Sequence, residues 1–112
     1  MPLVPRFYAE SDGTSPPRDY IGSLGTGERG KFWARVKVLC ERPMGEWPQA
    51  WYDKVEDKIW ELRFPPHRAL YILHEDCLVV LHSFKKKSGK LKEKDKAIAR
   101  RRRDRYLDAK GS

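Results

Sequence analysis

Two arginines flank a diproline break in the sequence, and each could hold a phosphate group. Arg63 and Arg68 lie on either side of Pro65-Pro66, on neighbouring predicted strands. A guanidinium presents a planar fork of N–H donors that fits two phosphate oxygens and stabilises charge developing on them. The same side chains could instead face solvent or bridge to Glu61. The pair predicts a phosphate-binding site, with the ion pair to Glu61 as the alternative.

The positive charge of the chain is concentrated after Phe84. The 112 residues include 24 Lys and Arg and 16 Asp and Glu, which gives a formal net charge of +8. Residues 1–84 hold 11 basic and 12 acidic side chains, whereas residues 85–112 hold 13 and 4. This distribution is typical of a surface that binds nucleic acid, although a solvated basic tail without a partner is the alternative. The two basic runs are Lys85, Lys86, Lys87 and Arg100, Arg101, Arg102, Arg103.

Three side chains near these cations could also contribute. His82 has an imidazole, whose ordinary pKa near neutral suits proton transfer, although a histidine in an apolar strand is more often packed. His67 adjoins Arg68 and could touch RNA. Tyr71 could orient a substrate or stack on a base, and its alternation with apolar neighbours equally favours the core.

Four tryptophans raise the question of base stacking, because aromatic rings beside basic residues hold single-stranded RNA. Trp33 and Trp60 fall at positions that we expect to face the core. Trp47 and Trp51 lie in a loop, where they could cover the sheet or contact a partner.

The hydrophobic pattern predicts a single α+β domain over residues 1–112, in the order β-α-α-β-β-β-α. The late strands form a small antiparallel meander, with a helical hairpin before it and a basic helix after it, and we expect the helices to pack on one face. The expected strands are 3–8, 59–64, 68–73 and 77–84; the expected helices start at Ser15-Pro16 and cover 28–40 and 91–107, and a loop covers 44–54.

Length and composition exclude several classes of protein. A chain of 112 residues has no room for a separate cofactor lobe. No apolar run approaches the roughly 20 residues of a membrane span, and the first residues do not have the pattern of a secretory signal. Cys40 and Cys77 form no short-spaced metal pair. We expect no metal site and two buried free thiols, with one disulfide as the alternative.

Four segments occur in an order and spacing that resemble a known superfamily. They are Ser15-Pro16-Pro17-Arg18-Asp19-Tyr20, Lys58-Ile59-Trp60-Glu61-Leu62-Arg63-Phe64, His67-Arg68-Ala69-Leu70-Tyr71 and Leu81-His82-Ser83-Phe84-Lys85-Lys86-Lys87. On these segments the chain resembles the RelE/ParE superfamily of toxin–antitoxin toxins, and within it the HigB-like, phage-derived branch.

The resemblance implies a RelE-like fold and a cytoplasmic toxin that cuts messenger RNA on the translating ribosome. The ribose 2′-hydroxyl would attack its own 3′ phosphate without a metal or other cofactor. An antitoxin encoded beside the toxin, expected to be a helix-turn-helix protein, would neutralise it. Arg68 matches the catalytic arginine of the middle strand, and Arg63 matches the Trp-Glu-Leu-Arg segment. Lys86 and Lys87 follow the third strand, where such nucleases carry a basic group near the scissile phosphate, and Lys85 would bind RNA.

The chain also departs from this pattern. Many RelE-type enzymes carry lysines on the first strand of the meander, where Ile59 and Glu61 stand here. Tyr106 is too far along the last helix to match their C-terminal tyrosine. Glu61 could replace a missing lysine as general base, or form a structural ion pair with Arg63. Two alternative functions stay open: a ParE-like inhibitor of DNA gyrase, and a non-catalytic RNA-binding module.

Overall fold

The computed structural model describes residues 2–86 and 89–111. Lys87, one of the predicted site residues, lies outside this range. The elements in chain order are β1 (Val4–Phe7), α1 (Pro16–Gly22), α2 (Thr26–Glu41), two single 3₁₀ turns (Met44–Glu46 and Gln49–Trp51), β2 (Tyr52–Glu56), β3 (Ile59–Phe64), β4 (His67–His74), β5 (Cys77–Lys85) and α3 (Glu93–Ala109).

The five strands form one mixed sheet in the order β1-β5-β4-β3-β2. Strands β2 to β5 are an antiparallel meander, and β1 pairs in parallel with β5. The α+β class is confirmed. Strand β1 contains Pro5 and lies at an edge of the sheet, where a proline is tolerated because it cannot donate to a neighbouring strand. The meander has one strand more than the sequence pattern predicts.

The additional strand is β2, which occupies part of the expected loop. Its residues pair with β3, with Tyr52 opposite Leu62 and Lys54 opposite Trp60. An edge strand with exposed Asp53 and Lys54 lacks the apolar alternation that identifies a half-buried strand. The observed order is therefore β-α-α-β-β-β-β-α.

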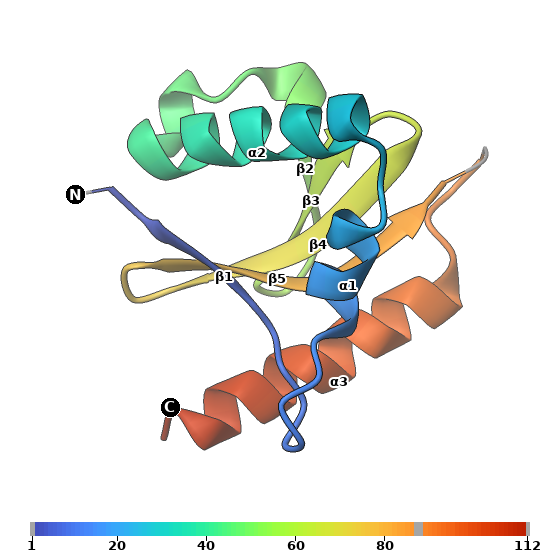
Figure 1. Ribbon diagram of the computed structural model, residues 1–112. Helices are drawn as coiled ribbons and strands as arrows, with labels where there is room; N and C mark the ends of the chain where they lie inside the picture. Colours follow the sequence, from blue (N-terminus) through green and yellow to red (C-terminus); the bar gives the residue numbers. More distant parts are fainter. Residues whose placement is uncertain (1, 87–88, 112) are drawn as a thin grey trace.

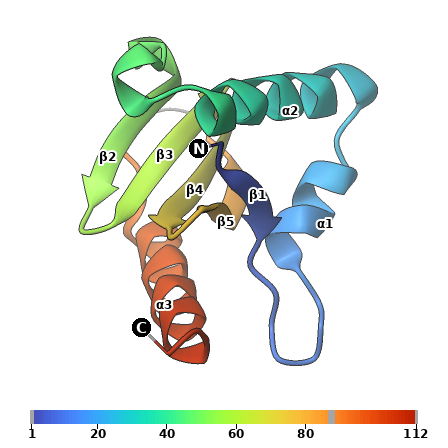
Figure 2. The same ribbon diagram turned by 90° about the vertical axis from the view of Figure 1, so that its left-hand side faces the viewer.

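The helices cover both faces of the sheet, which corrects the expectation of a single covered face (Figures 1 and 2). One hydrophobic core joins α1 and α2 to one face, and a second core joins α3 to the opposite face. Strand β4 supplies both cores, since Tyr71 points to α2 whereas Leu70 and Ile72 point to α3. A strand that is apolar on successive positions needs cover on both sides.

A bulge in β5 turns its last residues toward α3. Leu70 pairs with His82 and Tyr71 pairs with Val80, so Leu81 is inserted between them. Leu81 packs in the α3 core, and His82 binds Asp95 of α3. Bulges of this kind redirect side chains near the end of a strand.

The two cysteines are free and buried, as the sequence analysis expects. Cys40 belongs to the core under α2 and Cys77 to the core under α3, so the sheet lies between them. Burial raises the pKa of the Cys40 thiol to about 11, which keeps it protonated and unreactive at neutral pH. Among the described residues, every helix is too short or too polar to span a bilayer.

Candidate functional site

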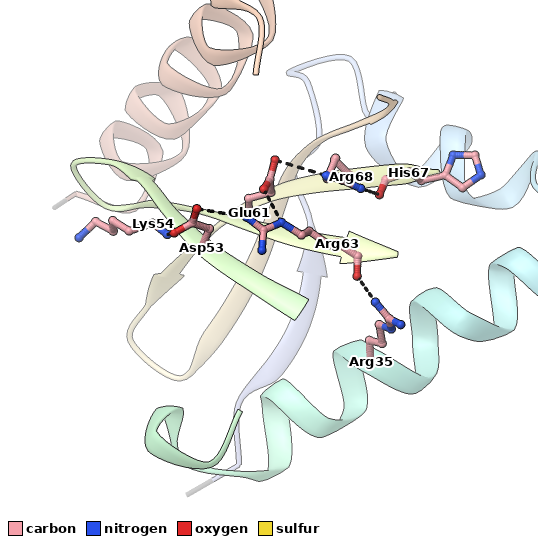
Figure 3. Close-up of polar contacts among 7 residues, drawn as sticks. All are labelled: Arg35, Asp53, Lys54, Glu61, Arg63, His67 and Arg68. Carbon is pink, nitrogen blue, oxygen red and sulfur yellow. Dashed lines mark hydrogen bonds and ion pairs between the residues drawn. The ribbon is translucent and has the colours of Figure 1, made fainter. Parts of the chain in front are cut away.

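Glu61 joins the two predicted phosphate-binding arginines (Figure 3). Arg63 and Arg68 are direct cross-strand partners on β3 and β4. The Oε1 atom of Glu61 lies 3.2 Å from Nε of Arg63, and its Oε2 atom lies 3.6 Å from Nε of Arg68. Arg63 also binds Asp53 of β2, with 3.1 Å between Nη2 and Oδ2. Both arginines therefore form the ion pairs that the sequence offers as an alternative to phosphate binding.

The alternation of β3 explains why these charges meet. Leu62 and Phe64 point into the core under α2. The intervening residues Glu61 and Arg63 must then project from the opposite face, the one that α3 partly covers. Arg35 of α2 donates a hydrogen bond to the carbonyl of Arg63, which fixes the end of β3 against the helix (Figure 3).

Glu61 is the electrostatic centre of this cluster. It is only 6% exposed, and it lies between two guanidiniums that would otherwise repel one another. A buried carboxylate with two cationic partners is costly to remove, because the cations lose their compensation. This arrangement favours a structural role for Glu61 over a free general base.

A hollow of about 320 Å³ opens beside this cluster, and we call it the basic hollow. It is lined by Asp53, Lys54, Val55, Glu61, Arg63, Lys86, Lys90, Leu91 and Lys96. Five of these side chains are basic and two are acidic. A concave surface with an excess of one charge concentrates the field that attracts an oppositely charged ligand, here a polyanion.

The predicted lysines lie at this hollow, to the extent that the structure describes them. Lys86 lines the basic hollow and also an adjoining one of about 410 Å³, which Lys85 lines as well. The backbone N–H of Lys86 donates to the carbonyl of Pro66 at 2.9 Å, so the backbone of Lys86 is anchored where β5 ends. Of the two arginines, Arg63 lines the basic hollow, whereas Arg68 lies deeper, with its side chain 16% exposed.

His82 lies between β5 and α3 rather than at the basic hollow. Its Nε2 atom is 2.8 Å from Oδ1 of Asp95, and its ring stacks on Phe84 at 5.0 Å between centroids. Burial lowers the pKa of His82, and Asp95 opposes part of that effect. The neutral imidazole is therefore favoured at neutral pH, in a packed position that links strand to helix.

His67 and Tyr71 are on the other face of the sheet. The hydroxyl of Tyr20 is 2.7 Å from Nδ1 of His67, and Nε2 of His67 is 2.6 Å from Oε2 of Glu28. His67 is 4% exposed and Tyr71 is fully buried. Burial strongly raises the pKa of the Tyr71 hydroxyl. Neither predicted RNA contact reaches a surface, since both side chains point from β4 into the packing under α1 and α2.

Two of the four consecutive arginines of α3 bind the turn between β2 and β3. Arg100 pairs with Glu56 at 3.5 Å and also with Glu93 of its own helix. Nη1 of Arg103 donates to the carbonyl of Asp57 at 2.9 Å. These contacts hold α3 against the sheet and partly neutralise the predicted RNA-binding run.

A third arginine, Arg102, is buried. Its Nη1 atom donates to the carbonyl of Leu81, the bulge residue, at 2.8 Å, and its Nε atom is 4.0 Å from Glu10. Burial lowers the pKa of Arg102. Only Arg101 is an exposed member of the run with no ion pair or hydrogen bond among the described residues.

Three basic residues that line the hollow are not predicted from the sequence: Lys54, Lys90 and Lys96. The first strand of the meander is β2 and not β3, and it carries one lysine, Lys54. The sequence of this strand, Tyr52 to Glu56, shows no alternation of apolar and polar residues that would have marked it. In residues 2–86 and 89–111, no three His, Cys, Asp or Glu side chains are grouped to hold a metal ion.

The tryptophans are also distributed differently from the expectation. Trp33 is 41% exposed, whereas Trp47 is 4% exposed and donates from Nε1 to the carbonyl of Leu39 at 3.1 Å. Trp51 lies under the guanidinium of Arg35, at 4.7 Å from the ring centroid. Trp47 therefore covers the core from the loop, and Trp33 lies at the surface of α2.

Comparison with known proteins places this site within a defined family. Residues 19–104 match the model of a family described as phage-derived protein Gp49-like (DUF891). The matched segment runs from within α1 to within α3, and it includes every residue that lines the basic hollow. A search among curated proteins gave no match.

Proposed function

The chain belongs to the Gp49-like family of phage-derived proteins, within the RelE/toxin-like superfamily, and from this premise we propose that it is a HigB-like toxin that cleaves messenger RNA on the ribosome. The family is consistent with the toxin of a toxin–antitoxin pair. The proposal adds the reaction, the substrate and the residues that carry them.

The observation that carries the proposal is the basic hollow beside the paired arginines. Arg63 lines it from β3, Lys86 lines it from just after the end of β5, and Lys90 and Lys96 line it from the α3 side. An RNA backbone needs cations on several sides of a phosphate, and an open hollow of about 320 Å³ offers them. The residues come from separate parts of the chain, so the fold itself creates the site.

The reaction is an in-line transesterification. The 2′-oxygen of the ribose forms a bond to the adjacent phosphorus, the bond to the 5′-oxygen breaks, and the products are a 2′,3′-cyclic phosphate and a 5′-hydroxyl. One proton leaves the attacking hydroxyl and one reaches the leaving oxygen. Arg63 and Lys86 stabilise the charge on the non-bridging oxygens. Arg68 acts through Glu61 as a positioning residue that holds Arg63 in place.

Expression in growing bacteria, followed by primer extension on a translated message, tests this proposal. We expect growth arrest and defined cuts with the wild-type protein, and loss of the cuts with Arg63→Ala and with Lys86→Ala. Lys37→Ala is the matched control, because Lys37 is exposed on α2, on the other face of the sheet. Arrest with intact messages would refute nuclease action, and a supercoiling assay would then identify a gyrase inhibitor.

One observation favours a second candidate, a non-catalytic RNA-binding module. Arg63 and Arg68 are both already bound to carboxylates, so phosphate must compete with Glu61 and Asp53 for them. In that case the purified protein binds RNA with an affinity that falls steeply with salt, and the RNA stays uncut on the ribosome.

The proposed partners follow from the same surface. Ribosome and messenger RNA would bind at the basic hollow in the cytoplasm. An acidic segment of a helix-turn-helix antitoxin would cover the same lysines and so inhibit the toxin. The co-purified complex of the two proteins should then bind RNA more weakly than the toxin alone.

A further inference from the structure

A second hollow lies around the sheet edge from the basic hollow. It has a volume of about 370 Å³ and is lined by Gln49, Tyr52, Asp53, Lys54, Trp60 and Arg63. Asp53, Lys54 and Arg63 also line the basic hollow. The two hollows therefore meet at β2, which is an edge strand of the sheet.

The second hollow differs from the first in its aromatic rings. Tyr52 and Trp60 have ring centroids 6.0 Å apart, and Trp47 supports Tyr52 edge-on at 5.2 Å. Trp47 is itself buried and hydrogen-bonded. The rings thus rest on a rigid support, which reduces the ordering cost of placing a flat ligand against them.

One face of the Trp60 ring is covered by the exposed side chain of Lys54. Nζ of Lys54 lies 4.8 Å from the centroid of the Trp60 ring. Lys54 is exposed, so its ammonium approaches the ring from solvent. A cation–π contact at an exposed site is weak, whereas stacking of a nucleobase on an aromatic ring is among the stronger contacts to single-stranded nucleic acid.

We propose that Trp60 is a stacking platform for one base of the RNA strand whose phosphates occupy the basic hollow. The base displaces the ammonium of Lys54 from the ring, and Lys54 then turns to the phosphate side, since it lines both hollows. Arg63 spans the two hollows in the same way, so a phosphate held by Arg63 brings its neighbouring base within reach of Trp60. This inference rests on the proposed function, because it needs RNA in the basic hollow.

Trp33 is also accessible to solvent, but its surroundings differ from those of Trp60. It is 41% exposed, and its neighbours are the apolar rings of Phe7 and Phe32 at 5.7 and 5.1 Å. It lies on α2 and does not line either hollow near Arg63. Exposure alone therefore does not distinguish the platform; the position of Trp60 in a hollow that Arg63 also lines does.

The test is a binding cycle with an oligonucleotide that cannot be cleaved. The probe is a fluorescein-labelled trinucleotide of 2′-O-methyl adenosine, together with three versions in which one position is abasic. With the wild-type protein, fluorescence anisotropy should show that one abasic version binds about tenfold more weakly. With Trp60→Leu, the intact trinucleotide should lose about the same tenfold, and the abasic penalty should disappear.

Two further variants serve as controls for the loss of the aromatic ring and for the loss of any exposed tryptophan. Trp60→Phe keeps an aromatic ring and should restore most of the affinity and the abasic penalty. Trp33→Leu removes the exposed tryptophan of α2 and should bind all probes like the wild-type protein. Trp60 is half-buried, so its replacement could affect folding. Thermal unfolding of the Trp60→Leu variant checks that it is folded at the assay temperature.

The outcomes separate this inference from the proposed function. If binding depends on salt and on Lys86 but the abasic penalty persists in Trp60→Leu, the platform is refuted and the basic hollow stands. If the penalty depends on Trp60 but binding is unaffected by Lys86→Ala, a base stacks on Trp60, but the proposal that its phosphates lie in the basic hollow is refuted. If no probe binds, the platform is refuted, and primer extension on a translated message decides the proposed function separately.

Discussion

Arginines and lysines from the last quarter of the chain occupy two neighbouring regions, the body of α3 and the basic hollow. In α3, Arg100, Arg102 and Arg103 each bind an acceptor on another element. At the hollow, Lys86 and Lys90 have no ion pair or side-chain hydrogen bond among the described residues. The positive charges of α3 therefore stabilise the fold, whereas those of Lys86 and Lys90 are available to a ligand.

The difference follows from the chemistry of the two side chains. A guanidinium has five donors in a fixed plane and is weakly hydrated, so it can satisfy buried carbonyls and carboxylates. An ammonium is a strongly hydrated point charge on a flexible stem and remains in solvent. Net charge read from a sequence therefore overstates the charge that a ligand meets, most of all where arginines cluster on a helix that packs.

The largest effect on stability is expected at Glu61, because Arg63 and Arg68 bind this carboxylate as the arginines of α3 bind their acceptors. Glu61→Ala leaves two guanidiniums side by side without their shared partner, and should lower the free energy of unfolding by about 3 kcal/mol. Asp53→Ala removes an exposed partner of Arg63 and should cost less than about 1 kcal/mol. Urea denaturation measures both, and equal losses would show that burial of Glu61 does not matter.

Arg102 tests the cohesive role of α3 itself. Arg102→Leu removes the donor to the Leu81 carbonyl in a buried setting, and should lower the free energy of unfolding by about 2 kcal/mol. The neighbouring Arg101→Leu should change it by less than about 0.5 kcal/mol, since Arg101 is exposed. If the two variants unfold alike, α3 is not held by its arginines.

The lysines should behave in the opposite way. The double variant Lys86→Ala, Lys90→Ala should leave the free energy of unfolding within about 0.5 kcal/mol. It should weaken RNA binding and reduce the slope of log affinity against log salt by about 2. Filter binding over a series of salt concentrations measures the slope, and an unchanged slope would remove these lysines from the interface.

The smallest effect concerns pH and the link between β5 and α3. Because burial lowers the pKa of His82, the unfolded chain binds its proton more readily, and stability is lost as pH falls through the ordinary histidine range. In His82→Gln the fall in melting temperature between pH 7 and pH 5 should be smaller than in the wild-type protein. An identical fall in both proteins would assign the acid sensitivity to other groups.

The strands that contact the core could be read from the sequence with good accuracy. The expected strand 59–64 coincides with β3, because Trp60, Leu62 and Phe64 alternate with polar residues. Strand β2 could not be read in this way, since its charged residues lie at an edge and are specified by pairing with β3. The face on which α3 packs was also beyond the sequence, because periodicity shows which side of a helix is apolar but not which side of a sheet it covers.

The candidate site was predicted in outline. The sequence places Arg63 and Arg68 together and names Glu61 as their possible partner, and these contacts are present. It does not reveal that Arg102 is buried or that Lys54 and Lys96 reach the hollow, since such contacts join residues far apart in the chain. Whether Arg63 and Lys86 act on RNA stays a prediction.

The bulge at Leu81 has a consequence for any molecule that competes with α3 for the sheet. The inserted residue turns a main-chain oxygen toward the helix, and Arg102 satisfies it from α3. A competing helix with only an apolar face would bury that carbonyl oxygen without a hydrogen-bond donor, which is unfavourable. A helix that replaces α3 on this face of the sheet must therefore carry a hydrogen-bond donor for the carbonyl of Leu81 at the position of Arg102.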